Sequence, residues 1–314
     1  MKSFEPHQRL VIFLLLALAL TCIISPWLAL GADWATARWP NVLDDERIPF
    51  PRVFNRAFMI SAIVLFVFLR RHLMAAELKG LLTVGRRDAA RDLLIGWGLA
   101  VASMAALLAA MTAADVYTPF FRLSLSLSLS RIFSAFMSGA FAGFLEEVFF
   151  RGILFAGLYR KGGALRAYLL ANLFYSAIHF VKPGERYYLD GIEPLAGFGH
   201  LLLTFAPFLE PLALLPGIFG LFLLGAVLSF ALARTGNLYL AIGLHAGWIL
   251  ALKTVRVFGD YSRTDLGWVF GAIEPKIVSG VATWIGIVLV GGALYHITRR
   301  RPRLAAGPLP AKAA

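Results

Sequence analysis

Three charged side chains stand together in the segment LEEVFFRG, residues 145–152, among large apolar residues. The apolar run around them, residues 132–159, contains no other charged side chain. Glu147 and Arg151 are four residues apart, so a helix places them on one face, where they can pair. Glu146 is turned by about 100° from Glu147, so the arginine can hold one carboxylate while the other stays available. An ionisable group in a membrane helix is costly to keep there and indicates a functional site.

Two histidines lie deep in apolar sequence and can face these charges. His179 lies in ANLFYSAIHF and His245 in NLYLAIGLHAGWIL, whereas the other four histidines lie in termini, in loops or near the ends of apolar segments. The turn RKGG, residues 160–163, precedes the helix of His179. Glu146 and His179 each lie about 16 residues from the centre of this turn, so antiparallel helices place them at the same depth.

A carboxylate and two imidazoles in an apolar bundle are suited to activating water. Glu146 can act as a general base, while His179 and His245 can stabilise the oxyanion of a tetrahedral intermediate. This set predicts peptide-bond hydrolysis. The same three residues could instead bind a catalytic zinc with water as the fourth ligand, although no H-E-x-x-H helix is present. A structural interpretation also stays open, because Glu147 with Arg151 can be an ion pair without catalytic function, and a buried histidine can simply hydrogen-bond between helices.

The sequence around His245 bears on the choice between the two mechanisms. A zinc-bound imidazole donates its other N–H to an acceptor. The neighbours of His245 at helical spacing are Ala241, Ile242, Ala246, Trp248 and Ile249. Only the tryptophan indole forms hydrogen bonds, and it is a donor. We therefore expect a metal-free mechanism with no cofactor, and keep zinc at Glu146, His179 and His245 as the alternative.

The elements that position these residues are membrane helices. Of the 314 residues, 59% are hydrophobic and only 15% are charged, and the mean hydropathy is +0.75. Soluble domains carry about a quarter charged residues. The long apolar runs favour one membrane bundle over two soluble domains. We predict an all-α, polytopic membrane protein with about eight transmembrane helices in one bundle.

The predicted spans lie at about 10–30, 57–69, 93–116, 132–159, 164–181, 213–233, 237–256 and 277–298. The second is short for a bilayer, which needs about 20 residues, and it can extend back to Phe54 and Asn55. Residues 200–216 are apolar but contain three prolines, so they stay unassigned between a re-entrant and an interfacial segment. LSLSLSLS, residues 123–130, alternates like a strand, but an isolated strand cannot satisfy its backbone in lipid. We expect it to be an interfacial start of the fourth helix.

The lysines and arginines predict the orientation. They concentrate in the connection 70–92 and in the tail from Arg299 onward, and such clusters lie on the cytoplasmic side. Eight spans then place both termini inside, and we expect a multi-pass protein of the inner (cytoplasmic) cell membrane. The net charge of +12 is accounted for by this topology and by attraction to anionic lipid, so no nucleic-acid partner is expected.

The first span admits a second interpretation as a signal peptide, because MKSFEPHQR is a basic leader and ALGA precedes Asp33 like a cleavage site. Its apolar stretch is long for a signal peptide, so we favour a membrane helix. Cys22 is the only cysteine, which excludes an intramolecular disulfide and a cysteine metal cluster.

Three motifs occur in order along the chain: E-E-x-x-x-R at Glu146, Glu147 and Arg151, an aromatic residue four before a histidine at Tyr175 and His179, and a last histidine motif at His245 in LHAGWI. Together they resemble the CAAX prenyl protease and bacteriocin-processing family of glutamic intramembrane endopeptidases, also called the Abi family. The resemblance covers roughly residues 130 to 255. The first motif in an apolar helix is fairly specific, and all three in order are a strong signal.

The resemblance implies an eight-helix fold with a catalytic cavity. It implies that Glu146 activates water, that His179 and His245 assist it, and that Glu147 and Arg151 form a supporting pair. The implied activity is that of an intramembrane endopeptidase. The implied partner is a membrane-embedded protein or peptide substrate, prenylated or not, within the lipid bilayer.

On this basis the chain divides into three parts. We expect N-terminal transmembrane helices at 1–129, a catalytic core at 130–256, and a last transmembrane helix with a basic cytoplasmic tail at 257–314.

One position departs from the family pattern. Many members carry an asparagine four residues after the last histidine, where this chain has Ile249. That asparagine is thought to help hold the oxyanion, so its replacement leaves a catalytically inactive immunity or scaffold protein as an alternative. Asn172 shares a helix face with His179 but lies about 10 Å away along the helix, too far for direct replacement. A transporter in which Glu146 and Arg151 line a translocation path is a third class of function.

Overall fold

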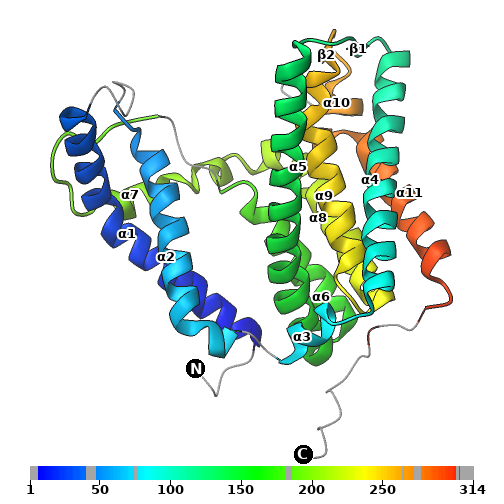
Figure 1. Cartoon of the computed structure of the whole chain (residues 1–314), viewed down its shortest axis with the longest axis horizontal. Helices are drawn as coiled ribbons and strands as arrows, with labels where there is room; N and C mark the ends of the chain where they lie inside the picture. The colour runs from blue at the N-terminus through cyan, green and yellow to red at the C-terminus, as the bar shows by residue number, and fades with distance from the viewer. Residues whose placement is uncertain are drawn as a thin grey trace, which may run out of the picture. The chain divides into compact units, whose positions relative to one another are not determined.

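The computed structural model describes residues 6–39, 47–73, 76–181, 186–263, 265–271, 277–301 and 304. Within these residues almost all regular structure is helical (Figure 1). A short antiparallel pair of strands joins β1 (Tyr117–Pro119) to β2 (Gly259–Tyr261), with Tyr117 opposite Tyr261. The predicted all-α class is confirmed.

The chain forms two compact units. One comprises Met1–Ala75 and Ile178–Leu214, and the other comprises Ala76–Ala177 and Leu215–Ala314. The second unit therefore contains the predicted carboxylates, the arginine and His245.

The first unit is built on two long helices, α1 (Pro6–Arg38) and α2 (Phe50–Leu73), which pack against each other. α2 begins before residue 57, as the short predicted span required. The helix α7 (Ala196–Leu203) packs on α1, and a 3-10 turn, η2 (Ala206–Leu209), follows it. The stretch 200–216 that the sequence left unassigned thus contains the end of α7, η2 and the beginning of the next long helix.

The second unit contains the remaining helices. They are α3 (Ala76–Leu82), α4 (Arg86–Ala113), α5 (Leu125–Glu147), the π-helix η1 (Val148–Phe155), α6 (Ala156–Ile178), α8 (Pro211–Thr235), α9 (Tyr239–Thr254), η3 (Val255–Val257), α10 (Gly267–Phe270), η4 (Ile277–Ser279) and α11 (Val281–Thr298), of which α6 and α8 reach into the first unit at one end. The alternating serines and leucines form the first turns of α5, so this segment is helical, as expected.

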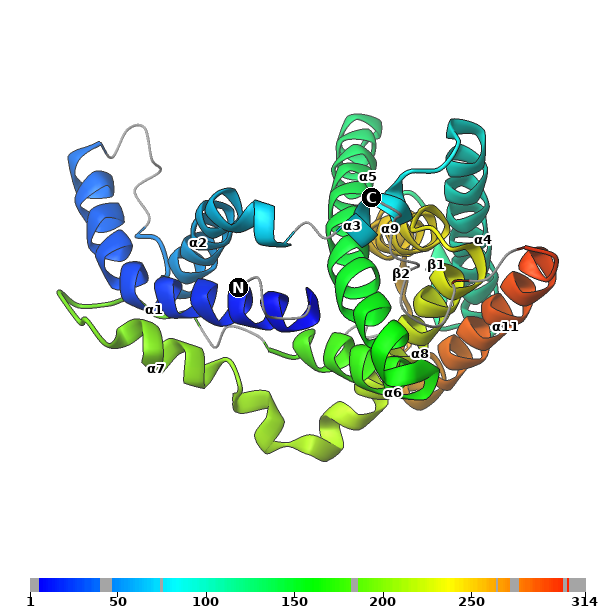
Figure 2. The same cartoon turned by 90° about the horizontal axis from the view of Figure 1, so that it is seen from below.

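α9 lies between α4 and α5 and contacts both along its length (Figures 1 and 2). Glycines permit this close approach. Gly139 and Gly143 of α5 lie against the backbone of Ala246, and a β carbon at Gly243 of α9 would be 2.1 Å from the carbonyl oxygen of Leu93 on α4. Small residues four apart are typical of tightly packed membrane helices. This packing fixes the height of α9 relative to α5.

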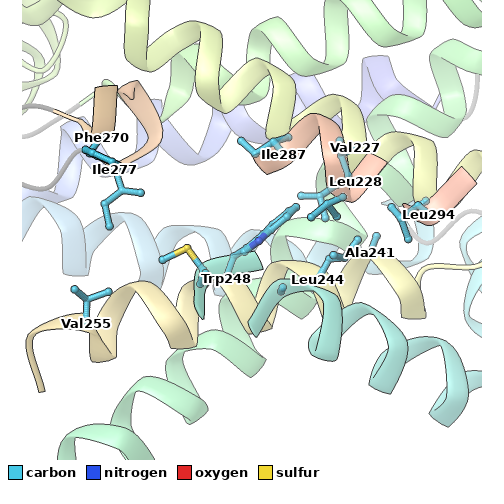
Figure 3. Close-up of a cluster of buried hydrophobic side chains, with 14 of the residues drawn as sticks. Val227, Leu228, Ala241, Leu244, Trp248, Val255, Phe270, Ile277, Ile287 and Leu294 are labelled. Atoms are coloured by element: carbon cyan, nitrogen blue, oxygen red, sulfur yellow. The ribbon is translucent and has the colours of Figure 1, made fainter. Parts of the chain in front are cut away.

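α9 also contributes to the apolar core of the unit (Figure 3). Buried side chains of α8, α9 and α11 meet there, among them Val227, Leu228, Leu244, Ile287 and Leu294. The Trp248 indole donates a hydrogen bond to Ser103 Oγ of α4 at 3.0 Å. α9 is covered on several sides. In its candidate span 61% of the most apolar stretch is buried, a larger share than in the other candidate spans of the described residues.

Six helices of the described residues are long and apolar enough to cross a membrane: Val11–Arg38, Phe50–Leu69, Arg86–Ala113, Pro211–Thr235, Tyr239–Val257 and Val281–Thr298. Each corresponds to one predicted span. The other two predicted spans, 132–159 and 164–181, are helical but lie outside this set of six, so the expected number of about eight is approximate. The apolar helices indicate a multi-pass membrane protein.

The chain reverses direction at Gly163, inside α6, where φ is 81° and ψ is 166°. Glycine adopts a positive φ without steric cost. On the two sides of this turn, Phe155 meets Tyr168 and Phe150 meets Tyr175, each with ring centroids 5.0 Å apart. The midpoint of each pair along the sequence falls between residues 161 and 163. The predicted antiparallel register around residues 162 and 163 is therefore confirmed.

Candidate active site

The end of α5 carries the two adjacent glutamates, and Arg151 follows in the π-helix η1. Arg151 Nη1 donates a hydrogen bond to Glu147 Oε1 at 2.9 Å. Both side chains are buried, with exposed fractions of 1% and 0%. The ion pair predicted from the four-residue spacing is confirmed. Removal of either charge would leave the other buried without compensation, which is strongly destabilising.

The π-helix η1 widens the backbone just after the glutamates. π-helical turns have i→i+5 hydrogen bonds and occur frequently at functional sites. Gly152 lies in this turn, and a β carbon there would be 2.8 Å from Leu78 Cδ1 of α3 and 3.3 Å from Leu238 Cδ1. α3 packs against η1 at this residue, which has no side chain. The sequence predicted an unbroken span at 132–159 and gave no signal of the change in helix type.

His245 of α9 joins the two glutamates. Its Nδ1 lies 2.7 Å from Glu147 Oε1, the oxygen that also accepts from Arg151. Its Nε2 lies 3.7 Å from Glu146 Oε2. The predicted approach of His245 to Glu146 is confirmed, and the chain of contacts runs from the arginine through Glu147 and the imidazole to Glu146.

The hydrogen-bond acceptor of His245 comes from α5. Its own helix offers none, as predicted, but Glu147 of the neighbouring helix takes that place. This removes the ground on which the sequence favoured a metal-free mechanism, because a carboxylate behind a histidine also orients metal-bound imidazoles. The absence of a cofactor stays a prediction.

Glu147 fixes the orientation and the protonation of the imidazole. Glu147 accepts a hydrogen bond from the Arg151 guanidinium, and a carboxylate in such an ion pair offers only acceptors to its other neighbours. His245 therefore donates from Nδ1, and Nε2 is left on the side of Glu146. A histidine held in this way by a buried carboxylate can take up and release a proton at Nε2, as in the triads of hydrolases.

The two glutamates differ in their access to solvent. The side chain of Glu147 is fully buried, whereas that of Glu146 is 32% exposed. The distance of 3.7 Å between Glu146 Oε2 and His245 Nε2 is longer than a hydrogen bond, and a contact of this length can be bridged by a third group. One carboxylate is thus fully buried in its ion pair, and the other is partly exposed; that Glu146 stays available to a reactant is still a prediction.

Arg151 has further contacts that the sequence did not reveal. Its Nη2 donates to the backbone carbonyl of Gly225 on α8 at 3.3 Å, and its guanidinium lies 4.2 Å from the ring centroid of Tyr175. A β carbon at Gly225 would lie 3.3 Å from Arg151 Nη2 and 3.0 Å from both Asn172 Oδ1 and Tyr175 Cδ1. A β carbon here would crowd all three side chains, so the glycine favours the close approach of the arginine to α8. The sequence gave no signal of this contact, because Gly225 is one of several small residues in an apolar helix.

Asn172 does not replace the asparagine of the family pattern. It is buried, its Nδ2 donates to the Tyr168 carbonyl at 2.9 Å, and its Oδ1 accepts from Ser229 Oγ at 2.9 Å. Its amide therefore joins α6 to α8. Ile249 remains a departure from the family pattern.

His179 follows the last turn of α6 and is half-buried. It belongs to the other compact unit, so its predicted position opposite Glu146 stays a prediction. Among the described residues, no group of three or more His, Cys, Asp and Glu side chains is arranged to hold a metal ion.

Comparisons with known proteins identify one family. Residues 128–251 match the family model described as Rce1-like, type II CAAX prenyl endopeptidase Rce1-like. The matched segment includes all three motifs. No curated protein and no solved structure matches the chain. The match confirms the resemblance predicted from the motifs: residues 128–251 of this multi-pass membrane protein are similar to the type II CAAX prenyl endopeptidase family.

Proposed function

We propose that this protein is an intramembrane endopeptidase in which Glu146 activates water for attack on a peptide bond of a membrane-associated substrate. The observation that carries the proposal is the chain of contacts from Arg151 through Glu147 and His245 to Glu146, within a segment that matches a peptidase family. A purely structural ion pair would need only the first two residues.

In the proposed reaction Glu146 takes a proton from water while the water oxygen bonds to the carbonyl carbon. The electron pair of the carbonyl moves onto its oxygen, and a protonated Nε2 of His245 donates a hydrogen bond to this oxyanion. The carbon–nitrogen bond then breaks as the oxyanion collapses, and Glu146 returns its proton to the leaving nitrogen. Glu147 balances the charge of the imidazolium throughout.

His179 has a second assisting role in this proposal. It rests on the spacing in the sequence, in which Glu146 and His179 each lie about 16 residues from the centre of the turn at residues 160–163. It would supply the second hydrogen bond to the oxyanion that the family's asparagine gives elsewhere, since Ile249 cannot.

The main test is Glu146→Gln, which keeps the shape of the side chain and removes the base. Loss of a general base lowers the rate by about 10²-fold or more. The exposed Glu210→Gln is the matched control and should cleave normally. Purified protein in liposomes is given a mixture of membrane-associated peptides, and products are identified by mass spectrometry. Near-normal turnover by folded Glu146→Gln protein rules out the glutamate mechanism.

A zinc-dependent peptidase is the second candidate, favoured by the carboxylate of Glu147 behind His245. In that case Glu146, His179 and His245 would hold the ion, which would act as Lewis acid. Metal analysis of active protein, followed by exhaustive chelation, separates the two mechanisms. Stoichiometric zinc whose removal abolishes cleavage and whose return restores it would establish the zinc mechanism.

A further inference from the structure

The first unit contains an open groove of about 700 Å³, lined by residues between Tyr187 and Leu209. Its walls come from the segment before α7, from α7 itself and from η2, all within this unit. Most of the lining is apolar, and it includes four large side chains that are exposed: Leu202, Leu203, Phe205 and Leu209. A volume of this size is typical of sites for small molecules. The lining residues are different from those of the candidate active site.

His200 of α7 is the buried polar side chain of this groove, with an exposed fraction of 1%. Its Nδ1 lies 2.9 Å from the Tyr187 hydroxyl oxygen. Its Nε2 is also buried and has no hydrogen-bond partner among the described residues. A polar atom without a partner is costly where water cannot reach it. A ligand that supplies the missing partner would remove this cost.

Tyr187 determines which kind of partner His200 Nε2 needs. Burial and the nearby Glu193 carboxylate raise the pKa of Tyr187, so the phenol keeps its proton. Within the described chain the partner of this hydroxyl is His200 Nδ1, so the hydroxyl donates to that nitrogen. Burial lowers the pKa of His200, and the neutral imidazole then carries its single proton on Nε2. The site therefore offers a donor and needs an acceptor.

Aromatic rings pack around the imidazole of His200. The ring centroids of Phe54, Phe50 and Tyr187 lie 4.6, 5.5 and 5.7 Å from its own centroid. These rings leave the groove as the side from which an acceptor can come. Nε2 lies just below the groove surface, so a ligand reaches it after a rotation of the imidazole or of a lining side chain.

The depth of His200 in the membrane follows from α2. The candidate span Phe50–Leu69 has 20 residues, which rise by about 30 Å and match the hydrocarbon thickness of a bilayer. His200 packs on Phe50 and Phe54, the first residue of this span and the residue one turn later. Just before the span, Arg47 forms ion pairs with two aspartates, as is typical of the polar layer of a membrane. His200 thus lies where the hydrocarbon core meets the headgroup region.

We propose that the groove binds a glycerophospholipid of the bilayer, with His200 Nε2 donating a hydrogen bond to one of its ester carbonyls. These carbonyls lie at the same boundary, between the headgroups and the acyl chains, and they accept hydrogen bonds. Glu193 is the charged residue of the lining, so a headgroup phosphate finds no cation there and the ester carbonyl is the acceptor that fits. The acyl chains lie along the apolar side chains of α7 and η2. This site does not depend on the proposed function, because its residues are not those that act on the scissile bond.

The test measures the preference of the full-length protein for an ester-linked over an ether-linked lipid. Purified protein in detergent receives equal amounts of diacyl and dialkyl phosphatidylcholine of the same chain length. The dialkyl lipid lacks the carbonyls and is otherwise alike. Native mass spectrometry gives the ratio of the two complexes with one bound lipid. Wild type should favour the diacyl lipid by about two- to tenfold, which is the equivalent of one neutral hydrogen bond.

Two variants assign this preference to the groove. His200→Phe keeps a ring against Phe50 and Phe54 but removes the donor, so the ratio should fall to about one. His296→Phe, at an exposed histidine of α11, is the matched control and should keep the wild-type ratio. A wild-type ratio of one, or an unchanged preference in His200→Phe, overturns the inference.

A second measurement uses wild type alone and does not depend on the folding of a variant. Diacyl phosphatidylcholine with a photoreactive diazirine in one acyl chain is crosslinked to the protein in liposomes, and mass spectrometry maps the labelled peptides. Excess labelling within residues 187–209 supports the site. Labelling spread evenly over the candidate spans contradicts it. A dimeric native mass without bound lipid would mean that a second copy covers the groove and that the inference is wrong.

Discussion

Substitution of Glu147 by glutamine tests whether the buried carboxylate has a function beyond neutralising Arg151. Arg151 Nη1 and His245 Nδ1 both contact the same oxygen, Oε1. A glutamine can present its own oxygen at this position, so the shape of the site is preserved. The substitution removes the negative charge and little else.

The expected loss of stability follows from the burial of the arginine. With an exposed fraction of 1%, the guanidinium would be left in an apolar interior with the Gly225 carbonyl and the Tyr175 ring as partners. Breaking a buried ion pair by removing one partner costs about 3–5 kcal/mol. Replacing both charges with apolar groups is often neutral. The double variant Glu147→Gln/Arg151→Met should therefore recover most of the stability.

Activity should not return with stability. His245 would still lack the ionised acceptor that holds its Nδ1 proton and balances an imidazolium. In hydrolase triads the loss of this carboxylate lowers the rate by about 10⁴-fold, and we expect at least about 10²-fold here. The double variant should thus fold like the wild type and remain nearly inactive.

The assay compares the three proteins in detergent micelles. Unfolding is followed by circular dichroism during a denaturant titration, and turnover is measured with the peptide mixture used for Glu146→Gln. Two results would refute the reasoning: a single variant as stable as the wild type, or a double variant with restored turnover. The second result would mean that Glu147 serves only as the counter-ion of Arg151.

Two further predictions concern the scaffold. Gly96→Ala should destabilise the second unit by about 1–3 kcal/mol, because the new β carbon would lie 2.3 Å from the Leu240 carbonyl oxygen of α9. Gly98→Ala is the control: its β carbon would have no atom within 4 Å, so its thermal melt should show equal or higher stability. Equal melting points for the two variants would contradict the packing of α4 on α9. Burial lowers the pKa of His200 in α7 below its ordinary value of about 6.5, so the stability that neutral His200 gives is present above that pH and is lost as the pH falls through the lowered pKa. The protection of the α7 amides from hydrogen exchange, corrected for the intrinsic pH dependence of amide exchange, should fall between pH 7 and 5, less so in His200→Gln, and a protection that does not change with pH would show the expectation to be wrong.

The sequence predicted what depends on local spacing and on the solvent. The long apolar runs predicted the all-α fold class, because a chain segment in lipid must satisfy its backbone hydrogen bonds within itself, and a helix does so. Glu147 and Arg151 were correctly paired, since four residues bring side chains together on any helix. The reversal near Gly163 was also predictable, because a glycine pair marks a turn between two apolar runs.

The tertiary structure alone decided which groups meet between helices. The bond from His245 to Glu147 joins residues 98 apart, and the contact from Arg151 to the Gly225 carbonyl joins residues 74 apart. Such contacts depend on the rotation and height of each helix, which here are set by glycines that bring α9 against α4 and α5. The apolar pattern of a membrane helix leaves that rotation undetermined, because lipid and protein interior are equally apolar, and only the packing of the whole bundle fixes it.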